Sequence, residues 1–173
     1  GFDAYGKTER AQALATVAWM PQIAELPKGM RAIDLVAYLC WMRGEDRASA
    51  LVRAEESLRA VGLTKSFKAK LGTLSGGMVR RVWLAQALAA DAEVLLLDEP
   101  STGLDPRQRE TMVRLIRETS AGTVLLSSHL LEDVRELAQR IVVLDQGRIV
   151  FDGALSSSMD AEWFMELTGD EAG

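Results

Sequence analysis

The sequence contains one cysteine, one histidine and few aromatic residues in 173 positions. The single cysteine, Cys40, cannot form an internal disulfide, which is typical of proteins in a reducing compartment. No run reaches the ~18 consecutive apolar residues of a membrane-spanning helix, so we expect any membrane role to be peripheral. The length of the sequence fits one domain, or a compact pair of subdomains, with enough residues to form a sizeable core.

The sequence also lacks an excess of positive charge. Lysine and arginine total 20 against 25 acidic residues, for a net charge of −5. A general nucleic-acid binder usually presents a basic face, so this balance argues against that class. We expect the basic pair Arg80 and Arg81, and the lysines at 65, 68 and 70, to form solvated faces or to contact acidic groups of a partner.

The most informative segment is Val94–Asp105. Its apolar start is typical of a strand buried on both faces of a parallel sheet. Asp98 and Glu99 follow directly, at the carboxyl end of the strand, where ligands of open α/β sheets bind. One carboxylate in such a place helps to hold a metal and its neighbour orients water. Taken alone, the segment fits a core strand with an acidic turn equally well.

Four other segments accompany this strand. Leu74–Met78 is followed by a helical pattern over Val79–Ala90, and Thr123–His129 is predicted to be a second buried strand that ends in the only histidine. Leu14–Trp19 is predicted to be a third strand, followed by a Pro-Gln turn. Between Gln22 and the Leu74–Met78 segment the patterns predict two or three helices, over 30–42 and Glu45–Val61, and no strand. Further patterns predict a helical cap at Gly62, a helix from Pro106, a hairpin around 145–147 and a terminal helix over 161–167.

Taken in order, these segments resemble the nucleotide-binding domain of an ABC transporter. The matches are Gln22 to the Q-loop, Leu74–Met78 to the signature motif, Val94–Glu99 to the Walker B strand, Ser101–Asp105 to the D-loop, and His129 to the switch histidine. Met78 stands where the most familiar signature has glutamine. The resemblance covers about residues 14–153 and implies an α/β fold of the P-loop NTPase type. That fold has a mostly parallel sheet, flanking helices and an inserted helical subdomain.

The resemblance also divides the chain into four segments. Residues 1–22 would be an N-terminal remnant of the ATPase core up to the Q-loop, and residues 23–74 the helical subdomain. Residues 75–153 would hold the rest of the core, and residues 154–173 a C-terminal helix.

ATP and Mg²⁺ are the cofactors that the resemblance implies. Asp98 would anchor the metal, and Gln22 would reach the metal or the attacking water. Glu99 would act as the base and His129 would hydrogen-bond the γ-phosphate. From position alone, a buried core histidine stays open as the alternative for His129.

The signature residues Ser75, Gly76 and Gly77 would bind ATP held by the opposite subunit, with Asp105 at the same interface. Free N–H groups at a helix N-terminus attract anions, and glycines let the backbone approach a phosphate. An ordinary N-cap turn at Ser75 is the alternative.

The implied partners are a second nucleotide-binding domain, as a homodimer or heterodimer, and a transmembrane permease, with no nucleic acid. The run Ser127–Val134 resembles subunits that power export through a separate permease from the cytoplasmic face of the membrane. A truncated, non-hydrolytic docking or dimerisation module without a phosphate loop is the alternative. A soluble translation-factor relative would need a second copy of the motifs, which this sequence does not contain.

The N-terminal segment Gly1–Thr8 fits the phosphate-loop pattern G-x-x-x-x-G-K-[ST]. A working phosphate loop follows a buried strand and opens a helix, and here no strand precedes Gly1. Lys7 and Gln22 are also closer together than in the family. We therefore expect the pattern to be a coincidence and the chain to lack the first third of the domain. A functional loop in an unusually short domain is the alternative.

Overall fold

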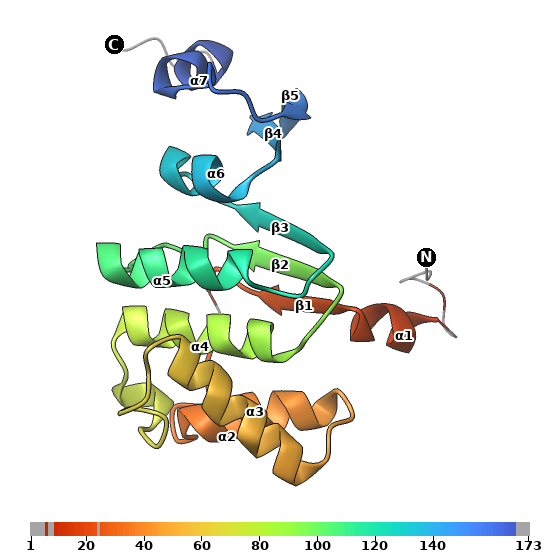
Figure 1. Cartoon of the computed structure of the whole chain (residues 1–173), viewed down its shortest axis with the longest axis vertical. Coiled ribbons are helices and arrows are strands. Elements are labelled where there is room, and N and C mark those ends of the chain that lie inside the picture. Colours follow the sequence, from red (N-terminus) through yellow and green to blue (C-terminus); the bar gives the residue numbers. More distant parts are fainter. Residues whose placement is uncertain (1–5, 7–8, 24, 169–173) are drawn as a thin grey trace. The chain divides into compact units, whose positions relative to one another are not determined.

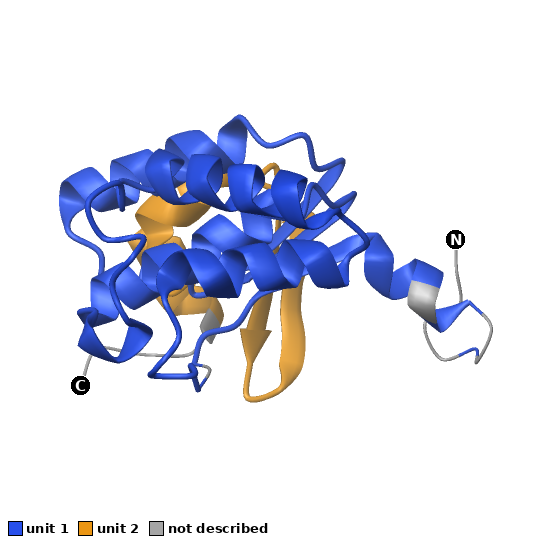
Figure 2. Ribbon diagram, turned by 90° about the horizontal axis from the view of Figure 1, so that it is seen from below, with its two compact units in different colours: residues 1–127 blue, residues 128–173 orange. Residues whose placement is uncertain are grey.

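The computed structural model describes residues 6, 9–23 and 25–168. The chain divides into two compact units, Gly1–Ser127 and Ser128–Gly173 (Figure 2). Among the described residues, no helix has the length and apolar character needed to cross a bilayer.

The first unit is built on a parallel sheet with the order β1-β2-β3 (Figure 1). Its strands are β1 (Val17–Met20), β2 (Val94–Asp98) and β3 (Thr123–Ser127). Met20 pairs with Leu97, and Asp98 pairs with Ser127, so the carboxyl ends of all three strands lie at one edge. The predicted parallel α/β sheet is confirmed, with the acidic turn at the edge where ligands bind.

The helices of this unit lie before, between and after the strands. They are α1 (Arg10–Ala15), α2 (Ala32–Met42), α3 (Arg47–Ala60), α4 (Gly76–Ala89) and α5 (Pro106–Arg117), with a short 3₁₀ turn at Leu71–Thr73. Helix α4 lies between β1 and the α2–α3 pair, and for that reason Val82 and Ala85 are fully buried (Figure 1). The helical pair inserted between β1 and α4 matches the predicted helical subdomain.

Local signals explain where the inserted helices begin and end. The Asp46 side chain caps α3 by accepting hydrogen bonds from the N–H groups of Ala48 and Ser49. Gly44 and Gly62 follow the two helices with φ of +102° and +75°, a region that glycine enters without steric cost. The predicted cap at Gly62 is confirmed, because that residue takes the left-handed conformation that ends a helix.

The strand predicted over Leu14–Trp19 begins later, at Val17. Residues Arg10–Ala15 form helix α1 instead, because arginine, glutamine, leucine and alanine all have high helix propensity. Thr16 ends this helix, with its hydroxyl group donating to the Ala13 carbonyl oxygen at 2.8 Å. An apolar residue at position 14 was mistaken for the start of the strand.

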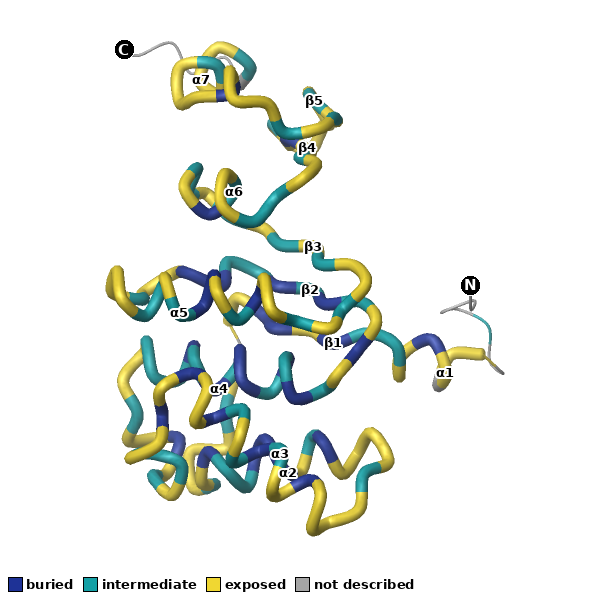
Figure 3. Tube along the Cα trace, in the orientation of Figure 1, coloured by how far each residue is buried: buried dark blue, intermediate teal, exposed yellow. Residues whose placement is uncertain are grey.

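Strand β3 also differs from its prediction. It ends at Ser127, two residues before His129, and its residues alternate between exposed and half-buried (Figure 3). The Leu125 side chain is 64% exposed. Among the described residues β3 has a pairing strand on one side only, so it is an edge strand and not the buried strand that its apolar sequence predicted.

The second unit holds a helix, a hairpin and a terminal helix. These are α6 (Leu131–Leu137), β4 (Arg140–Asp145), β5 (Arg148–Ala154) and α7 (Ala161–Thr168). Gln146 and Gly147 both have positive φ at the tip of the antiparallel hairpin, as a tight two-residue turn requires. Trp163 of α7 meets Phe151 of β5 edge to face at 5.1 Å. The predicted hairpin and terminal helix are confirmed.

Candidate functional site

The acidic pair at the end of β2 is held by one hydroxyl group from the neighbouring strand. The Ser127 hydroxyl donates to Asp98 Oδ1 at 2.7 Å and accepts the Glu99 N–H at 2.9 Å. Asp98 and Ser127 are paired residues of the parallel ladder, which places the hydroxyl between the two acidic residues. The sequence analysis did not select Ser127. The available signal was that Ser127 lies near the end of the strand predicted over Thr123–His129, which is β3 in the structure.

Glu99 occupies a strained turn. Its φ is +50°, which is uncommon for a residue with a side chain. Residues in such strained conformations are found mostly at functional sites. The Thr102 hydroxyl donates to Glu99 Oε2 at 3.1 Å, and the buried Pro100 follows Glu99 in the chain. A residue of the same loop, Thr102, therefore orients the Glu99 carboxylate, while Ser127 of β3 orients the Glu99 main chain.

Gln22 lies in the turn after β1, next to the end of β2. Its side chain is exposed, and its carbonyl oxygen accepts a hydrogen bond from the Arg80 guanidinium. Because Met20 and Leu97 are paired, the turns that follow these strands are neighbours. The structure thus brings together three predicted site residues, Gln22, Asp98 and Glu99.

The predictions for the basic pair on α4 were wrong. Arg80 is only 7% exposed and donates to main-chain carbonyl oxygens of the two turns. Burial lowers the pKa of the Arg80 guanidinium, and the charges of Asp98 and Glu99 oppose that shift. Helical spacing was the signal for its burial, since Arg80, Leu84 and Ala87 share one face of α4 and the latter two are apolar.

Arg81 is half-buried and also binds carbonyl oxygens. Its Nη1 donates to Val61 and Gly62 at 3.1 and 3.2 Å, and its Nε donates to Gly77 at 3.4 Å. Burial lowers the pKa of this guanidinium, while the charge of Asp105 opposes the shift. Arg81 therefore joins the end of α3 to the first turn of α4.

The Leu74–Met78 segment forms the start of α4. Ser75 is the N-cap, and its hydroxyl accepts the Met78 N–H at 3.3 Å. Gly76 faces open space, whereas a Cβ atom at Gly77 would lie 3.0 Å from the Gly103 carbonyl oxygen. The glycine at 77 thus lets the signature segment lie directly against the loop after β2.

Asp105 ends that loop and begins the next helix. Its carboxylate caps α5 by accepting the Gln108 N–H at 2.9 Å, and Pro106 occupies the first turn as predicted. Asp105 is exposed and lies two residues after Gly103, whose carbonyl oxygen approaches Gly77. Its predicted place at a subunit interface stays a prediction.

His129 belongs to the second unit, in the turn before α6, and it is exposed. Its neighbours fix the turn: the Ser128 hydroxyl donates to Asp133 Oδ2 at 3.1 Å and accepts the Leu130 N–H at 3.0 Å. Asp133 is fully buried. The alternative of a buried core histidine does not fit this exposure, and the predicted contact of His129 with a phosphate stays a prediction.

The donor set suits a magnesium ion that is bound together with a nucleotide. In the part of the chain that is described, no three His, Cys, Asp or Glu side chains gather in a metal-binding group. Mg²⁺ commonly uses one or two carboxylates together with waters and substrate phosphates, so Asp98 alone, at a sheet edge open to a ligand, fits the ion. The phosphate-loop pattern at Gly1–Thr8 lies outside the described residues except for Gly6.

This chain is similar in sequence to curated proteins and in fold to a solved structure. The linearmycin resistance ATP-binding protein of Bacillus subtilis is 33% identical over 92% of this chain and 53% of its own length. The methionine import ATP-binding protein of Mesorhizobium japonicum is 39% identical over 72% of this chain and 35% of its own length. A solved ATP-binding subunit of an ABC transporter matches the fold with a TM-score of 0.81 at 23% identity, covering 93% of this chain and 72% of that one.

This chain spans about half the length, or less, of these curated relatives. Its α/β core with an inserted helical pair is the fold of the solved ATP-binding subunit. The family model described as ABC transporter matches residues 3–102, more than half of the chain, and this chain therefore belongs to the ABC transporter family.

Proposed function

We propose that this chain is part of a subunit that binds and hydrolyses ATP with Mg²⁺ and powers export through a separate membrane permease. The observation that carries the proposal is the fixed acidic pair. The Ser127 hydroxyl binds both Asp98 and the Glu99 main chain, and Thr102 binds the Glu99 carboxylate. Phosphoryl transfer to water depends mainly on positioning and charge stabilisation. In this proposal the edge of the sheet would position the water, and the Mg²⁺ held by Asp98 would stabilise the charge.

Each residue of the pair has a distinct task in this proposal. The Asp98 carboxylate, with Oδ1 bound by Ser127, would hold the magnesium of the bound nucleotide through its remaining lone pairs. The metal would neutralise charge on the phosphates. Glu99 would accept a proton from the attacking water, and the exposed Gln22 amide would orient that water. His129 would donate a hydrogen bond to the γ-phosphate.

In this proposal a second copy of the domain would complete the site. The Ser75 hydroxyl, the open face at Gly76 and the free N–H groups at the start of α4 form a surface that suits an anionic phosphate. The nucleotide on this surface would be held by the partner subunit, with Asp105 at the contact.

The helical subdomain carries the features expected of a permease contact. Tyr38, Trp41 and Met42 of α2 are 46%, 55% and 62% exposed, and the two rings lie 5.9 Å apart. Exposed aromatic and methionine side chains are enriched at protein interfaces. We propose that this face contacts a permease from the cytoplasmic side. We propose export because a relative from Burkholderia pseudomallei named Nod factor export ATP-binding protein is 46% identical over 54% of this chain, whereas the import relative is 39% identical over 72% of it.

Glu99→Gln tests the proposed chemistry in the protein at its natural length. The amide keeps the size of the side chain but does not accept a proton, so we expect ATP turnover to fall about 100-fold or more. The affinity for ATP is expected to stay within about threefold, since the base acts mainly in the transition state. Turnover is measured by phosphate release and binding by calorimetry.

Glu93→Gln is the matched control, because Glu93 is an exposed acidic residue that precedes the opposite end of β2. It is expected to leave both quantities unchanged. Turnover of the Glu99→Gln protein at the rate of this control would refute Glu99 as the base.

A further inference from the structure

Arg80 joins the two turns of the proposed site through a single side chain. It lies on α4, five positions after the N-cap Ser75, and it is 7% exposed. A buried arginine is unusual unless its donors are satisfied, so the partners of its guanidinium define what it does.

The guanidinium divides its donors between the ends of two parallel strands. Nη1 donates to the carbonyl oxygens of Pro21, at 3.2 Å, and Gln22. Nη2 donates to the carbonyl oxygens of Asp98, at 2.5 Å, and Glu99. One planar group therefore spans the turn after β1 and the turn after β2, with a separate nitrogen for each.

This arrangement couples the positions of the two turns. All four acceptors are main-chain oxygens, and among the described residues the Nε atom of Arg80 has no hydrogen-bond partner. A buried guanidinium becomes more costly with each acceptor it loses, so a shift of either turn away from it is opposed. The planar fork of arginine fixes the distance between its two acceptor groups, which a lysine ammonium does not.

We propose that Arg80 is a positioning residue that holds the Gln22 turn and the Asp98–Glu99 turn as one rigid group. This inference rests on the proposed function, because Gln22 and Glu99 are the side chains proposed to orient and activate water. Ser75 is the N-cap of the same helix, so a displacement of the signature segment would move the group that holds both turns. Arg80 touches neither nucleotide nor water in this proposal and acts through the main chain.

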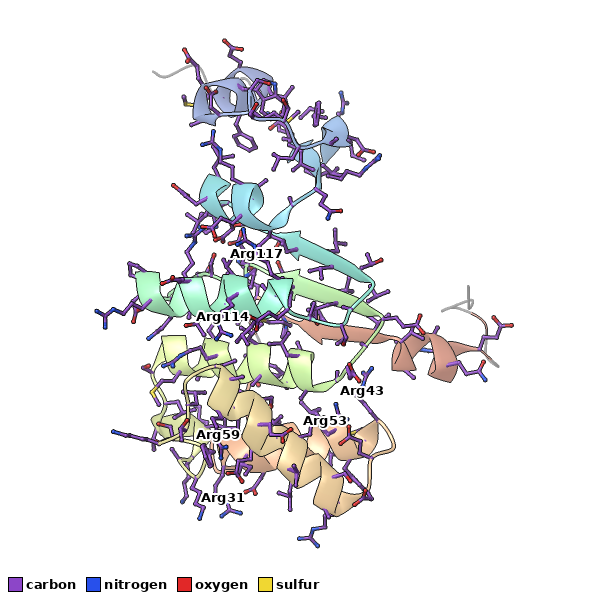
Figure 4. The ribbon with its side chains drawn as sticks, in the orientation of Figure 1. Arg31, Arg43, Arg53, Arg59, Arg114 and Arg117 are labelled. Atoms are coloured by element: carbon purple, nitrogen blue, oxygen red, sulfur yellow. The ribbon has the colours of Figure 1, made fainter. Side chains whose placement is uncertain are left out.

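Hydrogen exchange tests the coupling without any activity. In the nucleotide-free protein at its natural length, Arg80→Gln is expected to speed amide exchange about tenfold or more in residues 20–23 and 98–102 together. Arg43→Gln is the matched control, since Arg43 (labelled in Figure 4) donates to the carbonyl oxygens of Ala15 and Val17 at the other end of β1. The control is expected to affect only residues 15–17.

Unchanged exchange in the two turns, or faster exchange throughout α4 and the sheet, would overturn the proposal. Arg80→Lys provides a second reading if the glutamine variant does not fold. It keeps the charge but has one nitrogen for two turns, so it is expected to loosen one turn or both by a smaller factor.

A double-mutant cycle with Gln22→Ala gives the functional reading. Arg80→Gln is expected to lower kcat about 100-fold while the affinity for ATP stays within about threefold, because misplaced groups affect mainly the transition state. In the Gln22→Ala protein the same change is expected to cost about tenfold or less. If Arg80→Gln lowered kcat by the same factor with and without the Gln22 side chain, the proposal of joint positioning would be contradicted. Absence of hydrolysis in the unmodified protein would refute the proposed function alone, since the exchange result does not depend on it.

Discussion

At the scale of single residues, the Ser127 hydroxyl is the contact that keeps Asp98 and Glu99 together. It donates to one residue and accepts from the other, so its loss removes a donor to the Asp98 carboxylate and an acceptor of the Glu99 N–H. Hydrogen bonds to charged groups contribute more than neutral ones. The sequence indicated that Ser127 lies near the end of a strand, but not that it binds this acidic pair, because that contact depends on the pairing register of β2 and β3.

We predict that Ser127→Ala lowers ATP turnover about tenfold and raises the Mg²⁺ concentration needed for half-maximal rate. Ser127→Thr keeps the hydroxyl and is expected to stay near the unmodified rate. Initial rates over a series of Mg²⁺ concentrations measure both effects.

Ser120→Ala is the control for this series. The Ser120 hydroxyl also donates to a carboxylate, Asp91 Oδ1 at 2.6 Å, but it lies in an exposed loop outside the proposed site. Equal effects of Ser127→Ala and Ser120→Ala would show that any lost serine–carboxylate bond slows the protein, and would remove Ser127 from the site.

At the scale of elements, the start of α4 is fitted against the loop after β2. Two adjacent glycines there have opposite surroundings, since Gly76 faces open space and a Cβ at Gly77 would lie 3.0 Å from the Gly103 carbonyl oxygen. Sequence patterns predicted the helix from local signals, with an N-cap turn at Ser75 as the alternative to a phosphate-binding turn. They did not predict this close approach, which depends on a residue 26 positions away in the chain.

We predict that Gly77→Ala destabilises the fold by about 1–3 kcal/mol, because main chain must move to admit the new methyl group. Gly76→Ala is the matched variant in the same helical turn. It is expected to leave stability unchanged or to raise it by up to about 1 kcal/mol, since alanine favours helix over glycine. Denaturant unfolding of both proteins measures the difference. Equal free energies of unfolding for the two variants would contradict the prediction, because they would mean that the loop after β2 moves aside without loss of stability.

At the scale of the whole molecule, the order of elements was predictable and their mutual contacts were not. Apolar periodicity and turn residues placed β2, the inserted helices and the hairpin, because those signals are local in the chain. Arg80 was wrongly expected on a solvated face. Its partners are main-chain oxygens, and residue types in a sequence do not show which main-chain oxygens a side chain will meet. The edge position of β3 was missed for a similar reason, since an apolar run does not tell how many strands will pair with it.

The largest-scale prediction concerns the contact between two copies of the domain. Ser75 is exposed at the start of α4, where free N–H groups would meet the nucleotide of the partner. Ser75→Arg fills that surface and removes the cap, whereas Ser75→Asp keeps a good N-cap and places a negative charge before the phosphates. Both are expected to weaken ATP-driven dimerisation at least about tenfold, for steric and electrostatic reasons respectively.

Sedimentation with Mg²⁺ and ATP measures this dimerisation, in the Glu99→Gln protein so that the nucleotide persists. Because Ser75→Asp retains the cap, its thermal unfolding is expected to match that of the unmodified protein, which separates a lost contact from a damaged helix. ATP-driven dimers that form equally well with arginine and with aspartate at this position would show that the nucleotide of the partner binds elsewhere. The proposed contact between Ser75 of one copy and the nucleotide of the other would then be refuted for this chain. The proposed chemistry at Asp98 and Glu99 would not be affected, because Glu99→Gln tests it separately.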